Sequence, residues 1–208
     1  TDHKYQKLTI CSINSLTENF SSPLFPEVVV VYPESDKLNQ VESQAEFKNG
    51  IRSFEVRTSI KFIPLGFPDN EIIPEIKHKY ITSSALLKYQ LTDLAALGFD
   101  KILYLDPDTF IKGNPAKEIA RTHYGSLPLA MVPDFNPLAL RKSYPDSAHP
   151  VHAYFKTGSR YFNSGVMFMC LEKLLNEDFS QKCWALTREF AKVGNISNVD
   201  QDVINVVM

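Results

Sequence analysis

The chain has 208 residues, which is enough for one domain with a substantial hydrophobic core. Its 22 basic and 24 acidic side chains leave a net charge of -2, so the basic surface that binds nucleic acid is not expected. Hydrophobic residues make up 44% of the chain and charged residues 22%, which argues against a disordered or fibrous protein.

No segment predicts export or membrane insertion. The longest apolar runs, such as residues 28–31, fall far short of the roughly 18 residues that would span a bilayer. The polar start of the chain contains no hydrophobic stretch of a secretory signal. We therefore expect a cytoplasmic chain whose three cysteines are reduced. Because residues 203–208 stop within an apolar helical pattern, we also expect a single domain cut from a longer, multidomain chain.

In chain order, short apolar runs alternate with helical patterns. The runs predict strands at residues 8–13, 27–32, 53–63, 101–105, 129–132 and 166–170. Periodic apolar positions predict helices at residues 38–49, 83–97 and 179–192, with a last helix from Asp200. Continuous apolar runs are typical of parallel strands covered on both faces. The order predicts an α/β fold with a Rossmann-like, mixed and mostly parallel sheet flanked by helices.

Two of the helices have the clearest signals. The one at residues 83–97 ends before Gly98, which can adopt the left-handed conformation that closes many helices. The one at residues 179–192 has apolar side chains at helical spacing, namely Phe179, Cys183, Leu186 and Phe190. We expect both apolar faces to be buried.

Two aspartates follow the strand predicted at residues 101–105. Asp106 and Asp108 flank Pro107 at the carboxyl end of that strand, where open α/β sheets bind their ligands. Carboxylates one residue apart in a turn can face one divalent cation, because Mg²⁺ and Mn²⁺ prefer oxygen ligands. Such a cation can neutralise a departing diphosphate. The alternative is a solvated turn, since Asp and Pro are common turn formers.

Four segments extend this observation. They read KYQLTDL at residues 88–94, KILYLDPDTF at 101–110, FNSGVM at 162–167 and DQDVIN at 200–205. Together they resemble glycosyltransferase family 8, the glycogenin-like group of nucleotide-sugar enzymes with the GT-A fold. The resemblance is strong from about residue 81 onwards and weak before it. More loosely, the chain resembles the amino-terminal domain of multidomain chlorella-virus glycosyltransferases, which would place it in the host cytosol.

The resemblance implies how the donor is held. Asp106 and Asp108 would bind Mn²⁺, or Mg²⁺, against the diphosphate of a UDP-sugar. Lys88 would reach the donor sugar or phosphates, with a solvated lysine on a helix face as the alternative. Ser12 and Asn14 end the strand predicted at residues 8–13, where the family's nucleoside pocket begins, although turn polarity explains them nearly as well.

Two further segments are implied to contact the sugar. Asn163, Ser164 and Gly165 precede the strand at residues 166–170, where Gly permits close backbone approach and the Asn amide can bind sugar hydroxyls. Asp200 and Gln201 begin the last helix and are the candidate catalytic residues. In the family the matching pair faces the anomeric carbon, so they would stabilise oxocarbenium character. For Asp200 the alternative is an ordinary helix cap.

These roles together imply transfer of a hexosyl unit from a UDP-sugar to a hydroxyl of a glycan or glycoprotein acceptor. The resemblance implies retention of anomeric configuration, while related GT-A folds also host inverting chemistry. The family's later histidine motif has no counterpart here. His149 or His152, in a long segment at residues 134–160 that we expect to be a working loop, could replace it as a metal ligand.

Two other functions stay open. A catalytically inactive module that binds nucleotide-sugars or glycans would agree with the missing histidine motif, although both aspartates are present. A haloacid-dehalogenase-like phosphatase also ends an apolar strand with two aspartates separated by one residue. That family expects threonine two places after the second aspartate, where this chain has Phe110, and it places the motif on its first strand.

Overall fold

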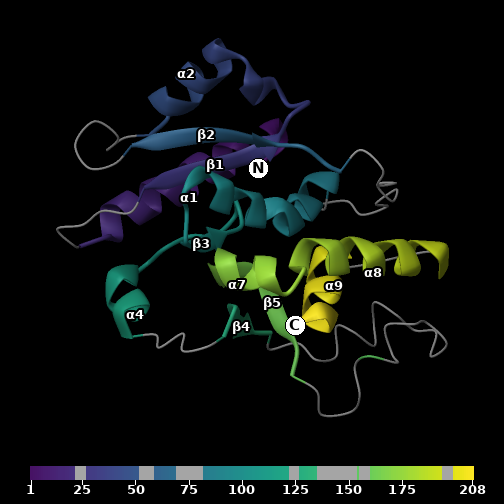
Figure 1. Cartoon of the computed structure of the whole chain (residues 1–208). Coiled ribbons are helices and arrows are strands. Elements are labelled where there is room, and N and C mark those ends of the chain that lie inside the picture. The colour runs from purple at the N-terminus through teal and green to yellow at the C-terminus, as the bar shows by residue number, and fades with distance from the viewer. Residues whose placement is uncertain are drawn as a thin grey trace. The chain divides into compact units, whose positions relative to one another are not determined.

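The computed structural model describes residues 1–21, 27–51, 59–68, 82–121, 127–134, 154, 160–193 and 199–208. The chain separates into two compact units. The first combines Thr1–Gly66 with Leu105–Gly125, and the second combines Phe67–Tyr104 with Ser126–Met208. Figure 1 identifies their helices and strands. None of the helices in the described ranges has the length and apolar character needed to cross a membrane.

The first unit contains a pair of parallel strands, seen side by side in Figure 1. β1 (Val28–Pro33) pairs with β2 (Ile60–Leu65) along its whole length. Among the described residues, the helices of this unit are η1 (His3–Tyr5), α1 (Gln6–Asn19), η2 (Lys37–Asn39), α2 (Val41–Asn49) and α4 (Pro115–Arg121). Its buried core consists of Ile13, Val30, Tyr32, Leu38, Phe47, Ile51 and Ile60. A parallel pair requires a crossover connection, and η2 and α2 lie within it.

The strand predicted at residues 8–13 is wrong, because this segment lies inside helix α1. Ile13 belongs to the buried core and Ile10 packs against it, so the apolar positions have helical spacing. The hydroxyl of Ser15, which is buried, donates to the carbonyl of Ser12 at 2.7 Å. Buried hydroxyls are thus satisfied within the helix, and core packing overrides the β-propensity of this Ile- and Thr-containing segment.

The other predictions for this unit hold in part. The strand at residues 27–32 is confirmed as β1. The helix at residues 38–49 is divided into η2 and α2. Of the strand predicted at residues 53–63, the structure has the end as β2, which continues to Leu65, and residues 52–58 lie outside the described ranges.

Asp36 begins η2 and is the polar anchor of this connection. Its carboxylate accepts hydrogen bonds from the backbone N–H groups of Leu38 and His3 and contacts the His3 ring. Burial alone would raise the pKa of Asp36, but these hydrogen bonds and the His3 charge hold the pKa below its usual value. Because the pKa of Asp36 is lower in the folded state than in the unfolded state, its ionised carboxylate stabilises the folded protein fully at pH values above the unfolded-state pKa. That stability is lost as the pH falls through the folded-state pKa.

We expect Asp36→Ala to lower the free energy of unfolding by about 1–2 kcal/mol at pH 7. The gap to the wild-type protein should narrow as the pH falls below about 4 and towards the lower folded-state pKa, because below that second pKa the carboxylate is protonated in both states. Urea unfolding at a series of pH values measures this. Glu46→Ala removes an exposed charge from α2 and should change stability by less than about 0.5 kcal/mol. A gap that does not vary with pH would contradict the assignment.

The second unit contains a three-stranded sheet in the order β3-β5-β4. β3 (Lys101–Leu105) ends at the boundary between the units, and β4 (Leu129–Pro133) runs antiparallel to β5 (Phe162–Cys170). The mixed α/β class is confirmed. The parallel sheet in the described ranges has only the two strands β1 and β2, so parallel pairing is less extensive than the sequence predicts.

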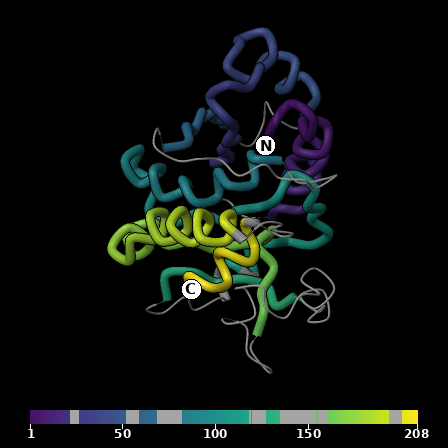
Figure 2. The backbone as a smooth tube through the Cα atoms, turned by 90° about the vertical axis from the view of Figure 1, so that its right-hand side faces the viewer, coloured from purple at the N-terminus to yellow at the C-terminus, as the bar shows by residue number. Residues whose placement is uncertain are grey.

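In the described part of the second unit, helices η3 (Ser83–Leu97), α7 (Leu171–Asn176), α8 (Phe179–Val193) and α9 (Val199–Val207) pack together. η3 contacts the other three, and Figures 1 and 2 both show it beside α8. Helix η3, wound as a 3₁₀ helix, ends at Gly98, which has a φ of 89° as its predicted role requires. The predicted apolar face of α8 is confirmed, since all four of its side chains are buried.

The cysteines are free, as predicted. Cys183 is fully buried on α8, and burial raises the pKa of its thiol, which keeps the group protonated. Near it, the rings of Tyr89 and Trp184 meet edge to face with centroids 5.3 Å apart. This aromatic contact packs η3 against α8 and so fixes the orientation of η3, on which Lys88 lies.

Candidate active site

The predicted metal ligands lie in the turn that follows β3, within the first unit. The backbone N–H of Thr109 donates to the carbonyl of Asp106 at 3.0 Å and closes the turn. Asp106 is half-buried and Asp108 is exposed. Burial, followed by the charges of Asp2 and Asp108, raises the pKa of Tyr5, so Asp108 lies within electrostatic range of that phenol.

The residues of this turn fit a hard divalent cation in part. They offer carboxylate oxygens, which Mg²⁺ and Mn²⁺ prefer, and Asp108 is open to solvent. In the portions of the chain that the structure describes, no group of three or more His, Cys, Asp or Glu side chains could hold a metal ion. His149 and His152 lie outside those portions. Asp106 and Asp108 are therefore candidates for two ligands of an incomplete coordination shell.

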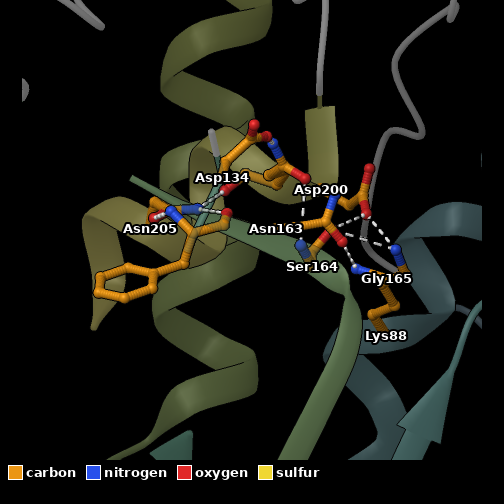
Figure 3. A network of polar contacts seen from close by, with 9 residues as sticks. Lys88, Asp134, Asn163, Ser164, Gly165, Asp200 and Asn205 are labelled. Atoms are coloured by element: carbon orange, nitrogen blue, oxygen red, sulfur yellow. Dashed lines mark hydrogen bonds and ion pairs between the residues drawn. The ribbon is translucent and has the colours of Figure 1, made fainter. Parts of the chain in front are cut away.

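A buried ion pair forms the centre of the site in the second unit (Figure 3). Nζ of Lys88, on η3, lies 2.5 Å from Oδ2 of Asp200, on α9. The hydroxyl of Ser164, on β5, donates to the same oxygen at 2.9 Å and accepts a hydrogen bond from Lys88 at 3.2 Å. The side chains of Lys88 and Asp200 are only 5% and 8% exposed. Three elements far apart in the sequence thus meet at one carboxylate.

Burial of this pair decides two alternatives that the sequence leaves open. Lys88 is not a solvated lysine on a helix face, because it is 4% exposed and its Nζ also lies 5.3 Å from the centroid of the Tyr104 ring. Asp200 is not an ordinary helix cap, because it lies inside α9, which begins at Val199, and its Oδ2 is used by Lys88 and Ser164. A buried charge is costly unless it is paired, so replacing either residue alone should destabilise the protein.

Gln201 is fixed beside the ion pair by two neighbours. Its Oε1 accepts a hydrogen bond from the backbone N–H of Ser164 at 3.0 Å. Its Nε2 donates to Oδ2 of Asp134 at 3.1 Å. Because a backbone N–H can only donate and a carboxylate can only accept, these two contacts define which end of the amide faces each neighbour.

An irregularity in the sheet frees the backbone at Ser164. Met131 of β4 lies opposite Met167, but the next residue, Val132, lies opposite Asn163, so residues 164–166 have no partner on β4. β-Bulges of this kind often occur beside active sites. The prediction that residues 163–165 precede a strand needs correction, because they lie inside β5. Asn163 stabilises the irregularity by accepting a hydrogen bond from the N–H of Gly165 at 2.8 Å.

Ser12 and Asn14 do not end a strand. Both lie in helix α1, where Ser12 is buried and the Asn14 amide donates to the carbonyl of Gly50 at 3.3 Å. The donor-binding role predicted for them depended on a strand ending at this point, and it loses that basis. The β-branched residues of this segment favour a strand locally, which is why the sequence predicts one here.

Some residues of the second-unit site escape the sequence analysis. Asp134 directly follows β4, as Asp106 follows β3, and this shared position is a signal that the sequence contains. Asn205 contacts the backbone of Phe162, and the hydroxyl of Tyr161 donates to Oδ1 of the fully buried Asp202 at 2.5 Å. The sequence alone gives no signal for these contacts, since they depend on how α9 packs against β5.

Comparisons with known proteins can be set beside this geometry. The sequence matches the family described as Glycosyl transferase family 8 over residues 1–208. No curated protein sequence matches the chain significantly. Among solved structures, the galactosyltransferase LgtC in complex with donor and acceptor sugar analogues has a TM-score of 0.71 and 18% identity, with 100% of this chain and 68% of LgtC covered.

Two further structures are similar. The apo structure of the bifunctional glycosyltransferase WbbM has a TM-score of 0.68 and 21% identity, with 100% of this chain but only 36% of WbbM covered. Apo mouse xyloside xylosyltransferase 1 has a TM-score of 0.62 and 15% identity, with 98% of this chain and 76% of that protein covered. At these identities the likeness shows the fold, which is that of GT-A glycosyltransferases.

The family match covers the whole chain, whereas the resemblance read from the sequence is strong only in its second part. It also decides against the phosphatase alternative, because that alternative requires membership of a different family. The chain belongs to glycosyltransferase family 8, and it is a glycosyltransferase.

Proposed function

We propose that this chain is a metal-dependent glycosyltransferase that moves a hexosyl unit from a UDP-sugar to a hydroxyl of a glycan or glycoprotein acceptor. The observation that carries the proposal is the buried contact of Lys88 and Ser164 with Asp200, next to the oriented amide of Gln201. The packing of η3 and α9 does not require a buried charge. The free-energy cost of burying the Lys88–Asp200 pair therefore points to a functional role for the pair.

Asp200 supports the sugar in this proposal. Its Oδ2 is used by Lys88 and Ser164, and no described residue donates a hydrogen bond to its Oδ1. Lys88 holds the carboxylate in place, so Oδ1 can act on positive charge that develops at the anomeric carbon. A carboxylate that accepts hydrogen bonds from a buried ammonium is a weak nucleophile, so we assign electrostatic support to Asp200.

Gln201, Asn163 and Ser164 shape the same region. Gln201 is held by the backbone of Ser164 and by Asp134, so it offers a fixed amide dipole without reorganisation during the reaction. Asn163 and Gly165 maintain the local turn of β5 that exposes the Ser164 backbone. Lys88, Asn163, Ser164 and Gly165 thus belong to the donor-binding set.

Asp106 and Asp108 would act on the diphosphate. A divalent cation of the Mn²⁺ or Mg²⁺ type, when bound there, supplies positive charge that stabilises the departing UDP. Asp106 and Asp108 would hold this cation through their carboxylate oxygens, against the diphosphate. In the transfer, the bond between the anomeric carbon and the phosphate oxygen breaks with its electron pair going to UDP. The acceptor oxygen forms the new bond and releases its proton.

A donor-release assay tests this function. The chain is incubated with UDP-glucose, UDP-galactose, GDP-mannose or p-nitrophenyl phosphate, with Mn²⁺ or with a chelator, and free nucleotide or nitrophenol is measured. We expect slow release of UDP from at least one UDP-sugar with Mn²⁺ and a loss of at least about tenfold with the chelator. Hydrolysis of p-nitrophenyl phosphate, or UDP-sugar binding without turnover in the presence of acceptors, would contradict the proposal.

A further inference from the structure

Asn205, which lies outside the residues assigned above, joins helix α9 to strand β5. Its Oδ1 accepts a hydrogen bond from the backbone N–H of Phe162 at 2.7 Å, and its Nδ2 donates to the carbonyl of the same residue at 2.7 Å. The same Nδ2 also donates to the carbonyl of Gln201 at 2.9 Å, one helical turn earlier. Figure 3 shows the Asn205 amide facing this backbone.

The spacing of these contacts links the helix to the strand in one register. Gln201 and Asn205 are four residues apart on α9, which corresponds to about 6 Å of helix rise. Their backbone partners, Ser164 and Phe162, are two residues apart on β5, which corresponds to about 6.6 Å of strand rise. Both side chains can therefore pair with the strand at once. A one-residue shift of α9 would turn each side chain by about 100° and break both contacts.

This register places the ion pair. Asp200 precedes Gln201 on α9, and its Oδ2 meets the side chain of Ser164, whose backbone N–H is held by Gln201. Asn205 touches neither Lys88 nor Asp200 in any described contact, yet it fixes the helix on which Asp200 and Gln201 sit. A displacement of about 1 Å at reacting groups can cost about 100-fold in rate.

We propose that Asn205 is a positioning residue for glycosyl transfer. By pairing with both polar groups of Phe162, it takes the place of a neighbouring strand and holds α9 so that Asp200 and Gln201 face the sugar. This inference rests on the proposed function. A side chain at this position that cannot both donate and accept hydrogen bonds cannot make both contacts with Phe162, even if it has the same size as Asn.

The first test separates catalysis from donor binding. We expect Asn205→Ala to lower kcat for UDP release by about 10- to 100-fold while the Kd for UDP with Mn²⁺ changes by less than about threefold. Asn205→Asp keeps the shape and the acceptor but loses both N–H donors, so it should lose at least as much activity as Asn205→Ala. Val206→Ala removes two methyl groups from the next, half-buried position of α9 and should stay within about threefold of wild type.

The second test asks whether Asn205 acts through Gln201. In a Gln201→Ala background, Asn205→Ala should cause a smaller further loss than in the wild-type chain, because one of the two groups that it positions is already gone. Additive losses would indicate a general structural role and would overturn the inference. If Asn205→Ala does not fold at the assay temperature, Asn205→Asp, which keeps the shape of the side chain, is measured at a lower temperature with the same criteria.

The outcomes also distinguish this inference from the proposed function. If the wild-type chain releases no UDP from any UDP-sugar, the proposed function fails and this inference fails with it. If the wild-type chain is active and folded Asn205→Ala or Asn205→Asp retains kcat within about threefold, the inference alone is overturned. A matching fall in kcat and in UDP affinity would likewise contradict a positioning role.

Discussion

Asp108→Ala should reduce Mn²⁺-dependent release of UDP from the donor by at least about a thousandfold, which corresponds to about 4 kcal/mol of transition-state stabilisation. The expected size follows from the role proposed for the turn after β3. A cation that has lost the Asp108 ligand, or is displaced, no longer offsets the charge of the departing diphosphate. Because Asp108 is exposed, its loss should leave the melting temperature nearly unchanged in the absence of ligand.

A matched control lies on the same strand. Asp100 precedes β3 and is exposed, so Asp100→Ala removes an acidic side chain from the opposite end of the strand without touching the turn. It should retain activity within about threefold. Asp108→Asn should recover part of its activity as the Mn²⁺ concentration rises, since an amide oxygen is a weaker ligand for the cation. Full activity of Asp108→Ala in a chelator-treated sample would remove the turn from the proposed mechanism.

Breaking the buried ion pair should produce the largest change in stability. We expect Asp200→Asn to lower the free energy of unfolding by about 3–5 kcal/mol, because it leaves the Lys88 ammonium buried without a counter-charge. Lys88→Met should have a similar effect, since it leaves the Asp200 carboxylate with only the Ser164 hydroxyl among these contacts. Both variants should also lose donor turnover. Urea unfolding and the UDP-release assay measure the two properties separately.

The double variant Lys88→Met/Asp200→Asn provides the sharper test. It removes both charges, so most of the lost stability should return, while activity stays absent. The ion pair between Lys61 and Glu27 is the control, because its side chains are 55% and 33% exposed at a distance of 2.6 Å. Lys61→Met should cost less than about 1 kcal/mol. If the losses of the two single variants simply add in the double variant, the pair is not coupled as the structure indicates.

Local patterns were sufficient for part of the site. β3 and the turn with Asp106 and Asp108 could be predicted, because a short apolar run followed by Asp-Pro-Asp is a strong local signal. The buried face of α8 and the end of η3 at Gly98 could be predicted from helical spacing and from glycine's left-handed conformation. In each case the residues that determine the structure are close together in the sequence.

Long-range packing determines what could not be predicted. Lys88 and Asp200 are 112 residues apart, and spacing on either helix cannot reveal that they meet. Helix α1 was mistaken for a strand because the surroundings of Ile13, rather than local propensity, decide its conformation. Asn205 gives no signal of its own, since its role depends on how α9 packs against the backbone of Phe162 in β5.

The central claim, that a metal at Asp106 and Asp108 holds the diphosphate of a nucleotide-sugar donor, is tested most directly by crystals soaked with Mn²⁺ and UDP. The anomalous signal of manganese then locates the ion without reference to activity. We expect one strong peak coordinated by carboxylate oxygens of both aspartates and by oxygens of the diphosphate, and no such peak in Asp108→Ala crystals. A manganese ion bound elsewhere, with both aspartates making no contact to metal or diphosphate, would contradict the claim.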